Sequence, residues 1–351
     1  MRRHTRKLAM TIRGLIRLHY SEWEYNPHWG GDSITELLLE ENPIINTQTG
    51  KPDSAERDNA ETFMDELLST DTYPNPGKGI SIFGGYYDGV RAAPKIALTT
   101  HQSTMLAGII LVLKKENHFA VEPTLNKLIK RLGPDIKGYV AKGTILYRAR
   151  IGISKSYQSL EGMGWAAKIR RRPLQGAQIA APPPPVATAG RVNRAGVSFF
   201  YLSSDETTAA VEVRPHPGHH ISIAGFKANK RLRVADFGHI DISKYVHSEE
   251  DLRLFHLAYS IDKSMSMPIT PEERSQYITT QLIADLARRQ GFDGIRFRSS
   301  VGKGVNICIF NPSHFDELPA LGKVLFVKSL SYSLDNVDTI LTPTEHDVEF
   351  D

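Results

Sequence analysis

The sequence predicts an α+β fold, with a mainly helical N-terminal domain followed by a mixed domain of strands and helices. Apolar residues recur at three- and four-residue spacing through much of residues 7–132, which is typical of amphipathic helices. Beyond about residue 138, short runs of strand formers lie before, between and after helical segments, as in α+β domains. We therefore expect a helical domain over 1–137, a mixed domain over 138–330 and a C-terminal tail over 331–351.

The helices of the first domain are predicted from their apolar stripes. Such stripes run through residues 8–19 and 34–38, and further helices are predicted over 55–68 and 122–132. The last of these ends at a Gly-Pro pair, a common helix stop. Residues 73–89 are rich in Gly, Pro and Tyr, so they are predicted to form an irregular connection.

The elements of the second domain are predicted from β-forming runs and helix caps. Strands are expected over residues 144–147, 197–202, 220–226, 232–237, 295–298 and 305–310. A helix capped by Ser204 or Asp205 must stop near Pro215. A second helix begins at the capping box Thr270–Glu273 and ends at Gly291.

Two segments of the second domain are predicted to be loops. Residues 168–172 are strongly basic, and we expect a long loop there. Four consecutive prolines then follow in the tract Ala180–Pro185, which suits an interdomain linker or a stiff active-site loop. Because a strand precedes the tract and a strand-helix unit follows it, we favour the active-site loop.

Composition limits the classes of function. The net charge of +4 is too weak to indicate nucleic-acid binding. The single cysteine, Cys308, excludes an internal disulfide and a Cys-rich zinc site, and its apolar neighbours indicate a buried thiol. No run reaches the roughly 18 apolar residues of a membrane helix. Arg13 and Arg17 interrupt the apolar core that a signal peptide needs, so we expect a cytoplasmic protein.

Residues 190–215 bring together three side chains that could act on a substrate. They place Arg191 before a short aromatic strand, Tyr201 on that strand and Glu212 on the following helix. A cation, a phenol and a carboxylate so close together suit an anionic substrate that contains a sugar to be cleaved. Tyr201 could instead be a core aromatic, and Glu212 could instead pair with Arg214 or face solvent.

Four segments in order resemble the RES domain family. They are TILYRAR, APPPP followed by GRVNRAGVSFFYLSSDETTAAVEVRP, YITTQ, and GFDGIRFRSS followed by GVNICIF, together spanning about residues 144–312. The resemblance implies a fold similar to ADP-ribosyltransferases, a toxin activity that consumes NAD, and an Xre-like antitoxin as partner. The N-terminal helices resemble those of longer members. This chain lacks the cysteine cluster of several such members, so no metal is implied.

The resemblance also implies roles for individual residues. Its catalytic residues correspond to Arg148, Tyr201 and Glu212. Its NAD-binding residues correspond to Tyr147, Arg148, Arg191, Asn193, Tyr201, Ser299 and Ser300. Glu212 would stabilise positive charge on the ribose, an arginine would bind the diphosphate, Tyr201 would stack on nicotinamide, and a serine would bond the carboxamide or ribose.

Some positions depart from the family or leave a choice open. Val192 stands where the family usually has an aromatic residue, and Arg298 where it usually has a proline or small residue. Adjacent strand residues face opposite ways, so either Ser299 or Ser300 points inward. Arg148 and Arg150 lie together at a strand end, and we expect one to face solvent.

Other motifs are assigned to ordinary structure. We expect His216, His219 and His220 to form a solvated loop, because their spacing matches no metal site. The Arg13–His19 pair suits any basic helix, and Gly302–Gly304 lacks the helix that follows a phosphate loop. NAD cleavage with water or phosphate as acceptor is thus the leading hypothesis. Transfer of ADP-ribose to a macromolecule, a degenerate binding or regulatory protein, and a homo-oligomeric state stay open.

Overall fold

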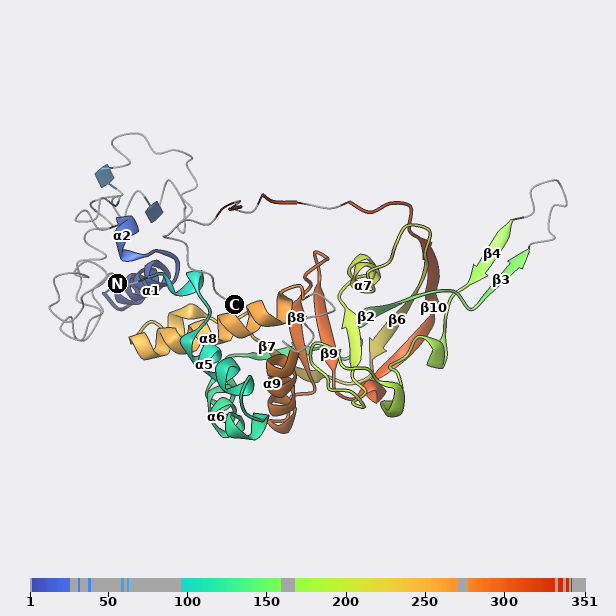
Figure 1. Cartoon of the computed structure of the whole chain (residues 1–351), viewed down its shortest axis with the longest axis horizontal. Helices are drawn as coiled ribbons and strands as arrows, with labels where there is room; N and C mark the ends of the chain where they lie inside the picture. Colours follow the sequence, from blue (N-terminus) through green and yellow to red (C-terminus); the bar gives the residue numbers. More distant parts are fainter. Residues whose placement is uncertain are drawn as a thin grey trace.

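The computed structural model describes residues 2–25, 31, 37–38, 58–59, 62, 96–158, 168–269, 277–331, 334–336, 339–340 and 342. An eight-stranded mixed sheet lies beside a group of helices, which confirms the predicted α+β class (Figure 1). Among the described residues, no helix is both long and apolar enough to cross a membrane.

The sheet is mixed, with the strand order β1-β7-β8-β9-β5-β2-β6-β10. Its strands are β1 (Lys137–Val140), β2 (Ile145–Ile151), β5 (Phe200–Ser203), β6 (His220–Ala228), β7 (Leu232–Asp236), β8 (Gly294–Arg298), β9 (Val305–Ile309) and β10 (Phe315–Phe326). β7 and β8 pair in parallel, and helices α8 and α9 lie between them in the chain. The other neighbouring strands pair antiparallel.

The helices differ in length and in what they cover. They are α1 (Arg2–His19), α2 (Glu22–Tyr25), α5 (Thr104–Leu113), α6 (Glu122–Leu132), α7 (Glu206–Glu212), α8 (Glu249–Ser266) and α9 (Tyr277–Arg289). Short 3-10 helices are η4 (Leu98–Thr100), η5 (His118–Ala120), η6 (Gly176–Gln178), η7 (Pro184–Val186), η8 (Ile242–Lys244) and η10 (Pro312–His314). In α7, the Asp205 side chain accepts from the backbone N–H of Thr208, so Asp205 is the N-cap.

Helices α5 and α6 share one core with α8, α9 and the sheet. Leu125 and Ile129 of α6 are fully buried in the same cluster as Ile261 of α8, Leu282 of α9 and Ile295 of β8. The described part of the N-terminal region is therefore packed directly on the second domain. The predicted boundary near residue 138 stays a prediction.

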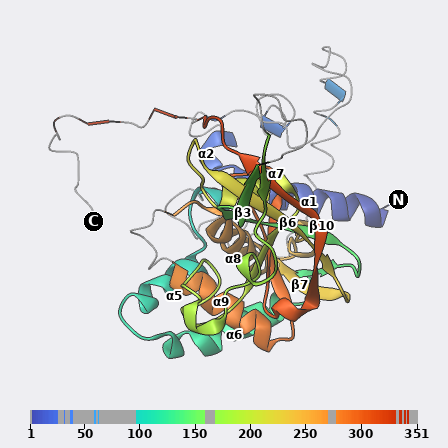
Figure 2. The ribbon, with the colours of Figure 1, turned by 90° about the vertical axis from the view of Figure 1, so that its right-hand side faces the viewer.

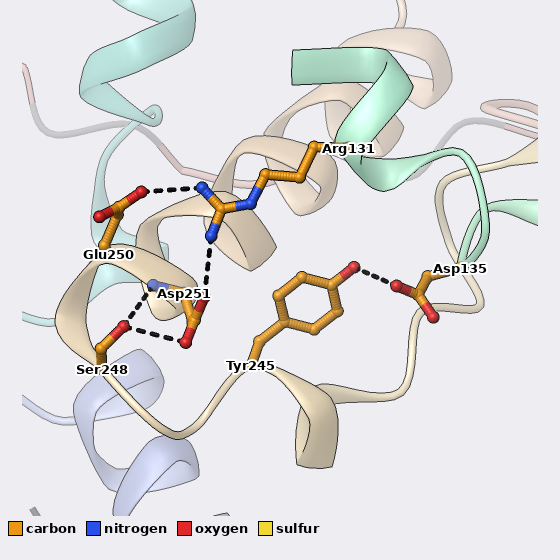
Figure 3. A network of polar contacts seen from close by, with 6 residues as sticks. All are labelled: Arg131, Asp135, Tyr245, Ser248, Glu250 and Asp251. Carbon is orange, nitrogen blue, oxygen red and sulfur yellow. Dashed lines mark hydrogen bonds and ion pairs between the residues drawn. The ribbon is translucent and has the colours of Figure 1, made fainter. Parts of the chain in front are cut away.

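Polar contacts reinforce the junction between α6 and α8 (Figure 3). Arg131, in the last turn of α6, donates to Glu250 at 2.8 Å and to Asp251 at 3.0 Å, both in the first turn of α8. Asp135 accepts from the Tyr245 hydroxyl at 2.6 Å. A cation at a helix C-terminus and carboxylates at an N-terminus also complement the helix dipoles, so charge and geometry favour the same packing.

Most predicted elements of the second domain are confirmed, with small shifts at their ends. One strand is longer than predicted, because β2 continues through Arg148 and Arg150 to Ile151. The basic segment 168–172 was predicted to be a loop, and this is wrong, since Ile169–Arg172 forms β4 and pairs with β3 (Lys155–Gln158). Helix α8 and strand β10 were not predicted.

Several predictions lie wholly or mostly outside the described residues. They are the helical stripe over 34–38, most of the helix over 55–68, the connection over 73–89, the capping box at Thr270–Glu273, and most of the tail over 331–351. The proline tract is described, and it lies against the sheet domain. There, the Ser198 hydroxyl donates to the carbonyl oxygen of Pro182 at 2.5 Å.

Candidate active site

A cavity of about 550 Å³ brings most of the predicted site residues together. Its lining includes Tyr147, Arg148, Arg150, Gly190, Arg191, Tyr201, Ser203, Glu212, Arg214, Tyr277, Phe297, Ser300 and Asn306. These residues come from β2, β5, α7, α9, β8 and β9 and the loops beside them. Two predicted residues, Asn193 and Ser299, are not in the lining, but each bonds to a residue that is.

Glu212, at the end of α7, has one carboxylate oxygen held by two donors. The Ser299 hydroxyl donates to Oε1 at 2.6 Å, and the Asn306 side-chain amide donates to the same oxygen at 2.6 Å. Within the described part of the chain, Oε2 of Glu212 has no protein donor. Glu212 is therefore held by neutral donors rather than by Arg214, and one oxygen is left for a ligand.

Asn306 is a site residue that the sequence analysis missed. It is 6% exposed, and its side-chain oxygen accepts from the Ser203 hydroxyl at 2.8 Å. This contact arises because Asn306 and Ser203 are directly paired across β9 and β5. A polar residue within the otherwise apolar strand Val305–Ile309 is the sequence signal that could have identified it.

Tyr201 closes the turn that carries Arg191. Its hydroxyl donates to Oδ1 of Asn193 at 2.7 Å and accepts from the backbone N–H of Val192 at 3.2 Å. Burial raises the pKa of Tyr201 well above its ordinary value, so the hydroxyl stays protonated. A Cβ added at Gly190 would lie 2.6 Å from Oδ1 of Asn193 and 2.8 Å from the Tyr201 hydroxyl, so only glycine fits there.

Arg148 links two backbone segments at the cavity wall. Its Nε donates to the carbonyl of Ile179 and its Nη1 to the carbonyl of Tyr201, both at 2.8 Å. Burial, and then the charge of Arg150, lower the pKa of Arg148 to about 10, which still leaves it cationic at neutral pH. Arg150 lies two residues along β2 and also lines the cavity, but its contact with the carbonyl of Gln178 is exposed, whereas the contacts of Arg148 are partly buried.

Arg191 is anchored by α8 and α9. Its Nη1 donates to the carbonyl of Met267 at 2.8 Å, and its guanidinium lies 5.3 Å from the centre of the Tyr277 ring. Burial lowers the pKa of Arg191. The Gln281 amide donates to the carbonyl of Gly190 at 2.8 Å, and Thr280 bonds the carbonyl of Arg191. The YITTQ segment thus fixes the turn.

The two serines differ in what they do. The Ser299 hydroxyl donates to Glu212 and accepts from the backbone N–H groups of Val301 and Gly302, whereas Ser300 lines the cavity. Ser299 therefore positions the carboxylate, and Ser300 is the serine available to a ligand.

The two family departures lie away from the cavity centre. Val192 is 1% exposed and packs into the main core, so its side chain does not reach the cavity. The exposed Arg298 side chain instead pairs with Asp262 at 2.7 Å. Neither departure places a new group in the cavity.

The cavity is strongly cationic. Among the residues that the structure describes, four arginines line it, against the single carboxylate of Glu212. Guanidinium groups pair well with phosphate oxyanions, so the lining suits a ligand with a diphosphate. Among the described residues, no group of three or more His, Cys, Asp or Glu could hold a metal ion. The three histidines His216, His219 and His220 are no exception, and His219 instead accepts a hydrogen bond from the backbone N–H of His216.

Comparison with known proteins relates this site to a family. Residues 165–335 match the model of the RES domain. The match covers Arg191, Tyr201, Glu212 and both serines, while Tyr147 and Arg148 precede it on β2. No curated protein matches the chain. Through most of its sheet domain and of the cavity built on it, residues 165–335, the chain is similar to the RES domain.

Proposed function

We propose that this protein consumes NAD by cleaving the bond between nicotinamide and ribose. One observation carries the proposal: the Glu212 carboxylate, held by Ser299 and Asn306, lines a cavity with four arginines. The match of residues 165–335 to the RES domain supports an NAD-related, toxin-like function at the level of the family. The volume of about 550 Å³ lies within the range of small-molecule sites.

The residues suit the chemistry of this cleavage. When the C–N bond breaks, nicotinamide leaves with the bonding electrons, and the ribose carbon develops oxocarbenium character. The Glu212 oxygen without a protein donor could accept from a ribose hydroxyl and stabilise that positive charge. The arginines would bind the diphosphate, and the rings of Tyr147 and Tyr277 offer surfaces for the flat ends of the dinucleotide. An oxygen of water or inorganic phosphate then bonds to the ribose carbon and loses its proton.

The test is product analysis of NAD incubated with the protein, with and without inorganic phosphate. Release of nicotinamide with free ADP-ribose indicates hydrolysis, and a phosphorylated ADP-ribose indicates phosphorolysis. We expect Glu212→Gln to reduce turnover by on the order of 10²–10³-fold, because it removes the charge and keeps the shape. Glu206→Gln is the matched control, since Glu206 lies on the same helix and pairs with Lys323 at the surface.

Two results would contradict the proposal. Intact NAD after long exposure to folded protein would exclude the activity, and full turnover by Glu212→Gln would exclude the role of this carboxylate. Labelled NAD in cell extract tests transfer instead, since only an ADP-ribosyltransferase leaves label on a macromolecule. If NAD also failed to raise the melting temperature, a binding or regulatory role without NAD would be favoured.

A further inference from the structure

A two-stranded ribbon projects from the body of the protein, away from the helices (Figure 1). It consists of β3 and β4, which pair antiparallel with Lys155 opposite Arg172 and Tyr157 opposite Arg170. Figure 2 looks onto the molecule from the side on which the ribbon extends. In the chain, the ribbon lies between β2 and η6, so it leaves the body beside the cavity wall.

The ribbon is basic and exposed. Every residue of both strands is exposed, and residues 155–158 and 168–172 contain no Asp or Glu. The same residues include five cations: Lys155, Lys168, Arg170, Arg171 and Arg172. The net charge of +4 for the whole chain conceals this concentration, because it averages the ribbon with the acidic residues elsewhere.

The strand register sorts the side chains onto two faces. Residues paired directly across an antiparallel ribbon share a face, and alternate residues along a strand do so as well. One face therefore carries Lys155, Tyr157, Arg170 and Arg172. This face joins three cations to an aromatic ring that is 49% exposed. Neither strand contributes an acidic residue to this face.

We propose that this ribbon binds the phosphate backbone of a double-stranded nucleic acid. Its two strands lie about 4.8 Å apart, so the ribbon is narrow enough for the major groove of B-DNA, which is about 12 Å wide. Lys and Arg side chains on such an element contact phosphates and set position without reading sequence. The ribbon is distinct from the cavity, so the interaction does not depend on NAD cleavage.

Salt dependence gives the proposal a quantitative form. If Lys155, Arg170 and Arg172 each neutralise one phosphate, they contribute about −2.7 to the slope of log K against log salt. Raising salt from 50 to 200 mM would then cost these three contacts about 40-fold in affinity. Their loss should lower affinity equally for duplexes of different sequence, because phosphate contacts carry no sequence information.

The experiment measures binding of the full-length protein to labelled 20-base-pair duplexes of DNA and of RNA over this salt range. The test variant is Lys155→Gln with Arg170→Gln and Arg172→Gln. The control is Lys114→Gln with Lys115→Gln and Lys127→Gln, which removes the same charge from exposed positions near α5 and α6. For the ribbon variant, we expect at least tenfold weaker binding and a slope of log K against log salt that is smaller by roughly 3. For the control, we expect the affinity to change by less than about twofold. The DNA and RNA arms identify which duplex is preferred.

Three results would overturn the proposal. The first is that the wild-type protein binds neither duplex at 50 mM salt. The second is that the two triple variants lose the same affinity for the duplexes. The third is that the ribbon binds anionic lipid vesicles while the protein does not bind duplexes. Melting temperatures of both variants within a few degrees of wild type show that any loss arises from the ribbon's charge rather than from unfolding. If the ribbon variant unfolds, the single substitution Arg172→Gln takes its place, with an expected loss of about one unit of slope.

Discussion

Asn306 donates its side-chain amide to Oε1 of Glu212, although 94 residues separate the two in the chain. The bond joins the second residue of β9 to the last residue of α7. Asn306 is itself oriented by the Ser203 hydroxyl, so a row of three polar groups ends at the carboxylate. Because Asn306 and Ser203 are almost fully buried, the row is held in a fixed geometry.

Replacement of this donor should disable the carboxylate without displacing it. Asn306→Asp keeps the shape of the side chain but sets a second carboxyl beside Glu212, and repulsion between two carboxylates favours a proton shared by the pair. We expect turnover of NAD to fall by about 10²-fold, and the acidic limb of the pH profile to move to higher pH. Asn117→Asp, which adds the same charge at an exposed site, should leave both unchanged. An unshifted acidic limb would mean that Asn306 does not act through Glu212.

The hydroxyl of Tyr201 should act on the protein rather than on the substrate. Tyr201→Phe leaves Oδ1 of Asn193 and the N–H of Val192 without this partner, so we expect a loss of about 1–3 kcal/mol in the free energy of unfolding. Turnover should fall less than tenfold, since the ring remains. Tyr139→Phe, on an exposed ring, is the control for both measurements. A collapse of turnover at unchanged stability would instead show that the hydroxyl acts on NAD.

The sequence predicts the parts of this site that are locally encoded. The cap at Asp205, the short helix and the stop near Pro215 all lie within about ten residues of Glu212, so the position of Glu212 follows from neighbours in the chain. The same holds for the strand of Tyr201. By contrast, the role of Asn306 depends on a partner strand and a distant helix, which no local pattern encodes.

Non-local pairing also explains the errors in the fold. β4 consists of Ile169 and three arginines, a run with few strand formers, and its extended form comes from its pairing with β3. The long helix α8 buries His256, Ser260 and Asp262, which obscure its apolar stripe. The sequence also left open which of Ser299 and Ser300 points into the site. Both reach it, because the turn after β8 does not follow the alternation of a strand.

Arg148 should be sensitive to replacement by lysine, although lysine keeps the charge. The guanidinium donates through two nitrogens to the carbonyls of Ile179 and Tyr201, and a single ammonium cannot reproduce that fork. We expect Arg148→Lys to lower the free energy of unfolding by about 1–3 kcal/mol, measured by urea denaturation. Arg150 makes one such contact, to the carbonyl of Gln178, so Arg150→Lys should cost less than about 1 kcal/mol. Equal losses for the two would contradict the bridging role of Arg148.

His256 should make the fold less stable in mild acid. It is 2% exposed on α8 and bonds through Nε2 to the carbonyl of His101 at 3.0 Å. Burial is the main cause that lowers the pKa of His256 to about 4. The unfolded chain therefore binds a proton near pH 6.5, whereas the folded chain resists it until about pH 4. Stability is thus fully present above pH 6.5 and declines as the pH falls toward 4, by on the order of 3 kcal/mol.

The measurement compares urea denaturation of the wild type and of His256→Gln between pH 7.5 and 4.5. Glutamine can still donate to the carbonyl of His101 but does not titrate in this range, so its stability should fall less steeply with acid. His247→Gln is the control, because substitution of a histidine outside this contact should leave the steep decline in place. Parallel curves for the wild type and His256→Gln would show that protonation of His256 does not couple to folding, and that other groups cause the loss of stability in acid.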